Sequence, residues 1–174
     1  MSRTYRPPEL LADHHDLTGF QCRSSERPTG CCDTRVNQPP PGTTRVFVVT
    51  EHKSQRVAAY YAWCMAQVRA NAARSRLRKV DGRYPQPVAL LTRLGVDVDH
   101  ERAGLGAGLL QDVFARIIEL SDDIGCRGPL VHAESAAART FYLHLFVPEF
   151  APSPTDDLHL VVLMKDIRRT LRAD

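Results

Sequence analysis

One stretch of this chain joins a buried strand, a polar turn, a run of glycines and an amphipathic helix. The apolar run 88–98 predicts a buried strand, and a polar turn follows it at 99–102. Gly104, Gly106 and Gly108 then stand at alternate positions. Apolar residues at helical spacing begin within this run, at Leu105, and continue at Leu109, Val113, Ile117 and Leu120. The sequence therefore predicts a strand that leads through a glycine-rich turn into a helix.

A glycine-rich step before a helix is typical of anion binding. The first N–H groups of a helix have no partner within it, and the helix dipole favours negative charge there. Glycine has no Cβ, so the backbone can approach an anion closely. The alternative is that the glycines only permit close packing of the helix on a sheet. The segment is not a P-loop, because no Gly-Lys-Ser/Thr closes it, and it fits the dinucleotide fingerprint poorly.

Length and composition favour one globular domain. The chain has 174 residues, of which 43% are hydrophobic, which is enough for a core of its own. No apolar run of about 18 residues occurs, so we expect no membrane span. Residues 1–15 lack the apolar centre of a secretory signal. The 5 cysteines are an odd number without a C-x-x-C pair, which predicts free thiols in the cytoplasm and no metal site.

The rest of the chain alternates between strand and helix patterns. Residues 1–43 are punctuated by prolines, and we expect a partly irregular segment there with a short helix around 10–20. The domain proper is expected at 44–174. The further expected elements are strands at 46–49, 57–68, 129–133 and 158–164, a turn at 52–54, and a helix at 135–145 with Ser135 as its N-cap. This order predicts an α/β fold with one mixed sheet and helices on its faces.

A second informative segment, residues 69–83, is strongly basic. Its cations are Arg69, Arg74, Arg76, Arg78, Lys79 and Arg83, against the single acid Asp81. A solvated helix or loop has such a composition, and so does a strip that binds phosphates. A cluster of one sign in a chain of net charge +3 favours phosphate binding. Binding through six cations would be strongly salt-dependent, losing on the order of 10³-fold in affinity between low and moderate salt.

The glycine segment resembles the acyl-CoA signature of the GCN5-related N-acetyltransferases, Arg/Gln-x-x-Gly-x-Gly/Ala. Here it reads Glu101-Arg102-Ala103-Gly104-Leu105-Gly106, with Glu101 where Arg or Gln is usual. More narrowly, the chain resembles the TacT-type toxins of type II toxin–antitoxin pairs. The motifs that carry this resemblance are His14-His15-Asp16 with Phe20 and Cys22, Thr44 to Val49, Ala59-Tyr60-Tyr61, Arg93 to Asp97, Val131-His132-Ala133 and Phe141-Tyr142.

The resemblance implies both a fold and an activity. The implied fold is a single domain with a mixed, mostly antiparallel sheet, splayed central strands and flanking helices. The implied enzyme is an acetyl-CoA-dependent N-acetyltransferase that modifies the α-amine of aminoacyl-tRNA in the cytoplasm and blocks translation. The implied partners are a second copy in a homodimer and a cognate antitoxin with a ribbon–helix–helix-like DNA-binding domain.

The resemblance also implies roles for particular residues. Tyr142 would protonate the thiolate that leaves when the amine attacks the thioester, as a general acid. Backbone groups would hold acetyl-CoA at Leu94, Gly95, Val96, Arg102, Ala103, Gly104, Leu105, Gly106 and Ala107. The tRNA would be held by Arg74, Arg76, Arg78, Lys79 and Arg93. Gly95 interrupts an apolar strand, which indicates a bulge or the close approach of a ligand. His132 and Phe141 are expected in the core.

Two other functions fit the same residues. One is an acetyltransferase for a small amine or a protein lysine, with the basic segment as a solvated face only. The other is an inactive acyl-CoA-binding regulatory module. Glu101 motivates the second, as does the stretch 23–30, which replaces the helix that follows the cysteine in the family.

Overall fold

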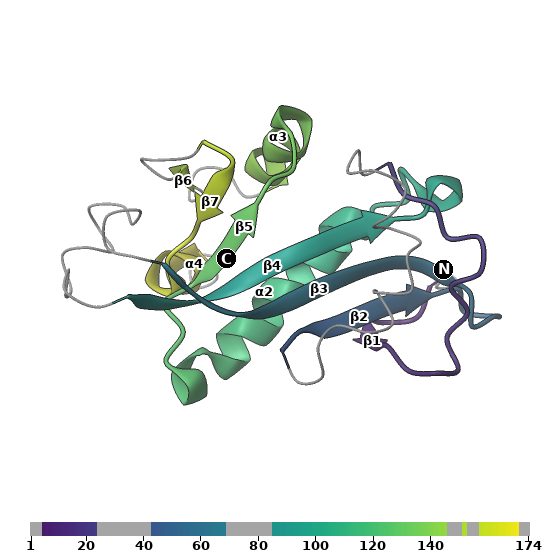
Figure 1. Ribbon diagram of the computed structural model, residues 1–174, viewed down its shortest axis with the longest axis horizontal. Helices are drawn as coiled ribbons and strands as arrows, with labels where there is room; N and C mark the ends of the chain where they lie inside the picture. Colours follow the sequence, from purple (N-terminus) through teal and green to yellow (C-terminus); the bar gives the residue numbers. More distant parts are fainter. Residues whose placement is uncertain (1–4, 24–42, 69–84, 146–150, 153–156, 171–174) are drawn as a thin grey trace. The chain divides into compact units, whose positions relative to one another are not determined.

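The computed structural model describes residues 5–23, 43–68, 85–145, 151–152 and 157–170 (Figure 1). Its strands are β1 (Glu9–Leu10), β2 (Arg45–Thr50), β3 (Val57–Val68), β4 (Gln86–Val96), β5 (Pro129–His132), β6 (Ala151–Pro152) and β7 (His159–Val161). Its helices are the 3₁₀ turn η1 (Val98–His100), α2 (Leu105–Ile124), α3 (Ala136–Leu145) and α4 (Met164–Thr170). No helix among these residues is long and apolar enough to cross a membrane.

The described strands form one mixed sheet in the order β1-β2-β3-β4-β5-β7-β6. The pairs β1–β2, β2–β3, β5–β7 and β6–β7 are antiparallel, and β4–β5 is parallel. The parallel ladder joins only Ala89–Leu91 of β4 to the strand β5, although β4 continues to Val96. The central strands therefore share a short ladder. The mixed, mostly antiparallel sheet predicted from the sequence is confirmed.

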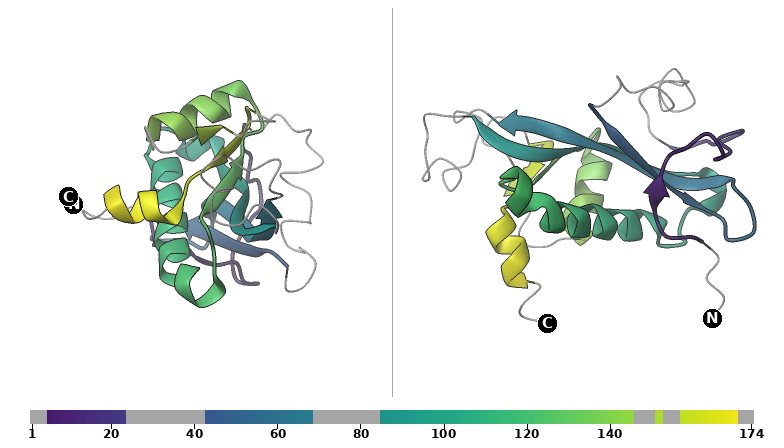
Figure 2. Two further views of the ribbon diagram at one scale, coloured as in Figure 1. Left: turned by 90° about the vertical axis from the view of Figure 1, so that its left-hand side faces the viewer. Right: turned by 90° about the horizontal axis from the view of Figure 1, so that it is seen from below.

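The chain forms two compact units. The first comprises Met1–Cys64 and Thr92–Val113, and the second comprises Met65–Leu91 and Phe114–Asp174. Strands β3 and β4 and the helix α2 each have residues in both units, and α2 is one continuous helix (Figure 2).

Within the first unit, the hairpin of β2 and β3 is buried. Its register pairs Arg45 with Trp63 and Val48 with Tyr60, and it shifts between Val49 and Thr50. Aromatic and β-branched residues fill both strands, as the predicted strands at 46–49 and 57–68 required. The Tyr61 hydroxyl donates a hydrogen bond of 2.6 Å to Asp112 Oδ2, which holds α2 against β3.

The N-terminal segment contradicts one prediction. Residues 10–20 do not form a helix: the edge strand β1 ends at Leu10, and turns follow it. Asp16 Oδ1 accepts a hydrogen bond of 2.9 Å from the Thr18 N–H, and Gly19 has a φ of 75°. Such a local side-chain bond offers the backbone an alternative to a helix, and a left-handed glycine ends one.

Within the second unit, Gly128 fixes the chain as it enters β5. Its φ is 153°, and a Cβ there would collide with the carbonyl oxygen of Val162. The strand predicted at 158–164 is shorter than expected, since β7 covers only His159–Val161 and α4 begins at Met164. Asp166 in the first turn favours the helix, because a carboxylate is stabilised at a helix N-terminus.

Candidate active site

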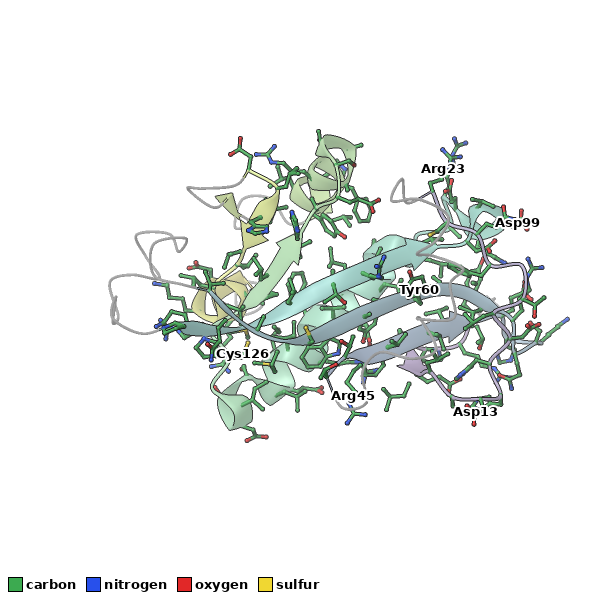
Figure 3. All side chains as sticks on the ribbon, viewed as in Figure 1. Asp13, Arg23, Arg45, Tyr60, Asp99 and Cys126 are labelled. Carbon is green, nitrogen blue, oxygen red and sulfur yellow. The ribbon has the colours of Figure 1, made fainter. Side chains whose placement is uncertain are left out.

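The exit from β4 is fixed by a buried carboxylate that the sequence reasoning did not single out. Asp97 is 1% exposed. Its Oδ1 accepts a hydrogen bond of 3.0 Å from the Asp99 N–H, and its Oδ2 accepts one of 2.9 Å from the Gln21 N–H. Figure 3 labels Asp99, whose N–H makes the first of these bonds, and Arg23, which follows Gln21 by two residues. The only sequence signal was the place of Asp97 at the end of the Arg93–Asp97 motif.

The backbone after Asp97 makes a tight turn with two left-handed residues. Arg102 has a φ of 61°, and Gly104 has a φ of 78°. A left-handed conformation costs a non-glycine residue about 1–2 kcal/mol, so the surrounding contacts must hold Arg102 there. A Cβ placed on Gly104 or on Gly108 would meet nothing within 4 Å. These two glycines therefore do not serve close packing, which was the alternative to anion binding.

The start of α2 presents unused N–H groups. The first bond of the helix joins the Gly108 N–H to the Gly104 carbonyl at 3.0 Å. Within the part of the chain that the structure describes, the N–H groups of Leu105, Gly106 and Ala107 make no hydrogen bond. The first turn of α2 contains no acidic residue that would repel an anion. The predicted helix start at Leu105 is confirmed, and its geometry suits a phosphate.

Glu101 departs from the acyl-CoA signature, but its charge is balanced locally. Arg23 Nε lies 2.9 Å from Glu101 Oε1. The carboxylate side chain is 25% exposed and the arginine side chain is 74% exposed, so the pair lies at the surface. The neighbouring Arg102 is exposed. The turn therefore presents no unbalanced negative charge to an incoming anion.

The predicted cofactor-binding residues of β4 lead directly into this turn. Leu94 and Val96 are half-buried, and Gly95 is buried. A Cβ on Gly95 would lie 2.8 Å from Cε1 of Tyr60, so the close approach expected at this glycine is made by an aromatic ring. Arg93 is exposed on the same strand.

Tyr142 lies on α3 in the second unit. The Ser135 Oγ accepts a hydrogen bond of 3.1 Å from the Ala138 N–H, which confirms Ser135 as the N-cap. The Tyr142 side chain is 8% exposed. Burial first, and the charge of Glu134 second, raise the pKa of Tyr142 to about 12. Its phenol is therefore protonated at neutral pH and can donate a hydrogen bond.

Known proteins identify the fold around these residues. No protein-family model matches the sequence. A protein of Mycobacterium tuberculosis (strain ATCC 25618 / H37Rv) named tRNA-acetylating toxin is 37% identical over 164 residues, which cover 94% of this chain and 95% of that protein. This chain belongs to the tRNA-acetylating toxins. They are N-acetyltransferases of the GCN5-related family.

Solved structures of such toxins share the fold. AtaT complexed with acetyl-methionyl-tRNAfMet superposes with a TM-score of 0.81 at 23% identity, over 96% of this chain and 99% of that chain. The KacTA–DNA complex gives 0.76 at 22% identity, over 98% and 99%. A mutant AtaT bound to acetyl-CoA and the C-terminus of its antitoxin AtaR gives 0.69 at 21% identity, over 95% and 97%. The predicted acetyltransferase fold is confirmed.

Two motif residues of this tRNA-acetylating toxin lie outside the core, contrary to the prediction. His132 is exposed, and its ring meets that of His159 edge-on at 4.2 Å between centroids. It is the last residue of β5, beyond the ladder with β4. Phe141 is 38% exposed. Successive helix residues point about 100° apart, so burial of Tyr142 turns Phe141 outward.

The basic segment of this toxin, residues 69–83, lies outside the described residues. Four of the predicted tRNA-binding residues, Arg74, Arg76, Arg78 and Lys79, lie outside the described residues. The fifth, Arg93, is exposed. Among the described residues, Cys22, Cys64 and Cys126 form no disulfide, and burial raises the pKa of the Cys126 thiol.

Proposed function

We propose that this protein transfers the acetyl group of acetyl-CoA to the α-amine of aminoacyl-tRNA and so blocks translation. One observation carries the proposal: after a glycine turn, α2 begins with N–H groups that no described residue accepts. The chain that presents them is 37% identical to a tRNA-acetylating toxin over 94% of its length. AtaT in complex with acetyl-methionyl-tRNAfMet has the same fold.

The turn would hold the coenzyme by its diphosphate. The N–H groups of Leu105, Gly106 and Ala107 would bind the phosphate oxygens, assisted by the helix dipole and by Arg102. The pantetheine arm would lie along Leu94, Gly95 and Val96, beyond the ladder with β5. There the backbone groups of β4 would pair with the arm and polarise the thioester carbonyl. AtaTR has been solved bound with acetyl-CoA.

Tyr142 would supply the proton in the transfer. The neutral amine attacks the carbonyl carbon, a C–N bond forms, and the C–S bond breaks. The phenol donates its proton toward the departing sulfur, and the proton that the amine loses restores the phenol. Thiols have a pKa of about 8.5, well below that of this phenol, so loss of the phenol proton to sulfur must be coupled to uptake of the proton that the amine releases. AtaT and KacT have both been solved as tyrosine-to-phenylalanine mutants.

Arg93 and the basic segment would bind the tRNA backbone. Arginine pairs with phosphate through two parallel hydrogen bonds, and a row of cations gives affinity without sequence preference. The α-amine of an aminoacyl ester is largely neutral near pH 7, so the reaction needs no dedicated base. This account requires no metal ion in the transfer step.

We also propose binding partners and a cellular location. The protein would act in the cytoplasm as a homodimer, with residues 44–174 as its catalytic domain, and would be neutralised by a cognate antitoxin with a ribbon–helix–helix-like DNA-binding domain. The neighbouring complexes of AtaT with the C-terminus of AtaR and of KacTA with DNA support such a partner.

Label transfer from acetyl-CoA tests this function. The protein is incubated with labelled acetyl-CoA and with charged tRNA, deacylated tRNA or a lysine peptide in parallel. We expect label only on charged tRNA, and no label with Tyr142→Phe. Transfer to the peptide and not to charged tRNA would establish the lysine acetyltransferase instead. Coenzyme binding in a calorimeter without turnover on any acceptor would establish the inactive module.

A further inference from the structure

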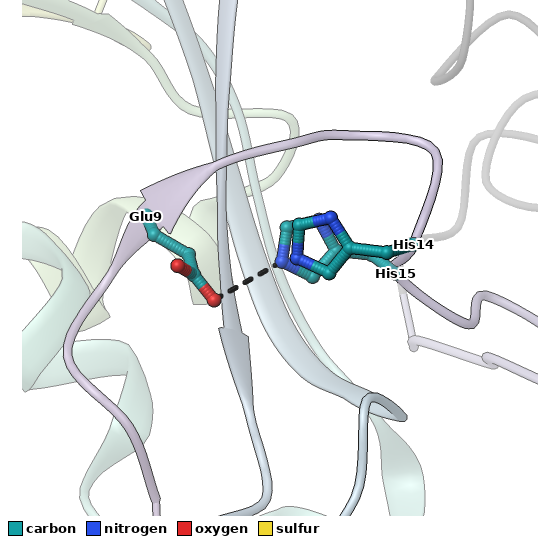
Figure 4. A group of neighbouring side chains, drawn as sticks. All are labelled: Glu9, His14 and His15. Atoms are coloured by element: carbon teal, nitrogen blue, oxygen red, sulfur yellow. Dashed lines mark hydrogen bonds and ion pairs between the residues drawn. The ribbon is translucent and has the colours of Figure 1, made fainter.

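A carboxylate and two imidazoles converge in the N-terminal segment, at residues outside the proposed coenzyme site. One ligand atom from each of Glu9, His14 and His15 lies within 4.8 Å of the others. Glu9 belongs to β1, and the two histidines follow in the next loop, with ring centroids 4.0 Å apart (Figure 4). His15 is 8% exposed, whereas Glu9 and His14 are exposed. The cluster thus has one buried anchor and an open side.

We propose that Glu9, His14 and His15 bind a divalent transition-metal ion of the zinc type. Zinc takes imidazole nitrogen and carboxylate oxygen at about 2.0–2.2 Å, which sets two tetrahedral ligands about 3.3 Å apart. His15 Nε2 and Glu9 Oε1 are 3.1 Å apart, so this pair needs almost no movement. Two imidazoles disfavour calcium and magnesium, which prefer oxygen ligands.

The second nitrogen of His15 lies near both the N–H and the carbonyl group of Ala12. Its Nδ1 lies 2.9 Å from the Ala12 nitrogen and 3.2 Å from the Ala12 carbonyl oxygen. Without metal, the Ala12 N–H donates to Nδ1, and the Nε2–H donates to Glu9. With metal on Nε2, the proton would lie on Nδ1 and be donated to the Ala12 carbonyl, and the Ala12 N–H would have to turn away from the ring. Such a carbonyl partner commonly orients a metal-bound histidine.

The bound ion would stabilise the loop that carries Gln21, whose N–H bonds Asp97 just before the glycine turn. Glu9 pairs with Val48 on the edge of the sheet, and the loop of the two histidines runs on to Gln21, which donates to Asp97. An ion bound to Glu9 and to both histidines would tie this loop to β1. Two of the three ligands are exposed, so water would complete the coordination. The sequence predicts no metal site, because adjacent histidines do not have the spacing of a zinc motif.

Metal titration of the full-length protein tests the site without measuring acetylation. The chelator-treated protein is titrated with Zn²⁺ in a calorimeter and with Co²⁺ in a spectrophotometer. We expect one ion per chain, the visible d–d bands of four-coordinate Co²⁺ and a raised melting temperature. The spectrum should lack a thiolate charge-transfer band, which separates this site from the cysteines.

Two variants and a control locate the ion. His14→Ala and Glu9→Gln should each weaken binding by more than about tenfold, since even loss of an outer partner costs 10- to 100-fold. His52→Ala removes another exposed histidine of the same unit and should leave binding unchanged. His14 is exposed, so its loss should not unfold the protein. Equal affinity in the parent and in both variants, a thiolate band, or no binding to the folded parent would overturn the proposal.

Discussion

Helices α2 and α3 begin in opposite ways. At α3, the Ser135 side chain accepts the Ala138 N–H at 3.1 Å, so the helix start is closed by its own residue. At α2, Gly104 stands in the capping position and has no side chain to offer. A capping side chain and a bound anion compete for the same N–H groups. We therefore propose that α2 binds the coenzyme at its start, whereas α3 serves to hold Tyr142.

Tyr142→Phe should give the largest effect, and it should separate catalysis from binding. The variant keeps the buried ring and removes only the proton donor. We expect kcat on charged tRNA to fall by about 10²- to 10⁴-fold, with an unchanged KM for acetyl-CoA. Steady-state kinetics measure both, and Phe141→Leu, a change of the exposed neighbour, is the control. A normal kcat in Tyr142→Phe would remove Tyr142 from the mechanism.

Gly104→Ala and Gly108→Ala form a matched pair at the start of α2. Neither methyl group meets another atom within 4 Å, but only Gly104 has a left-handed φ, of 78°. Alanine at Gly104 costs about 1–2 kcal/mol and should move the N–H groups, raising the KM for acetyl-CoA roughly tenfold. Alanine at Gly108 should leave the KM unchanged and stabilise the helix by about 0.5–1 kcal/mol. Similar KM values in both variants would show that the left-handed backbone at Gly104 does not position the N–H groups for the coenzyme.

The stability of the protein should fall in alkali because of Tyr142. Its pKa is raised from 10.0 to about 12, so between these values the unfolded chain releases the proton and the folded chain keeps it. The contribution is complete below about pH 10 and is lost as the pH rises toward 12. Urea unfolding at about pH 9 and pH 11 should show a loss that is about 1.3 kcal/mol smaller in Tyr142→Phe. Identical losses would contradict the buried phenol.

Ser135→Ala opens the closed start of α3. The loss of an N-cap destabilises a protein by about 1 kcal/mol, which thermal unfolding measures. The KM for acetyl-CoA should not change, because the coenzyme does not use this helix start. A raised KM would show that both helix starts contribute to binding, and the contrast between them would fail.

Arg23→Ala should give the smallest effect. It leaves Glu101 unpaired beside the turn, and an exposed ion pair is worth less than about 1 kcal/mol. We expect a rise of a few-fold at most in the KM for acetyl-CoA at low salt, which disappears at high salt. The double variant with Glu101→Gln should restore the KM. No rescue would mean that Arg23 acts by another route.

The sequence predicted local structure well and long-range contacts poorly. Strand β3 and the start of α2 follow from patterns within a few residues, and so does the cap at Ser135. The helix expected at 10–20 failed because Asp16 bonds the Thr18 N–H in a turn. The support of the turn could not be predicted, since the Gln21–Asp97 bond spans 76 positions. No periodicity encodes such a pair.

The most direct test of the coenzyme site follows backbone amide shifts while CoA is titrated into isotope-labelled protein. We expect the largest shifts at the N–H groups of residues 103–107. We expect only small shifts at Ala136–Ala138, where α3 begins and the Ser135 hydroxyl already accepts the Ala138 N–H. Calorimetric binding of CoA with unmoved amides at 103–107 would contradict the account.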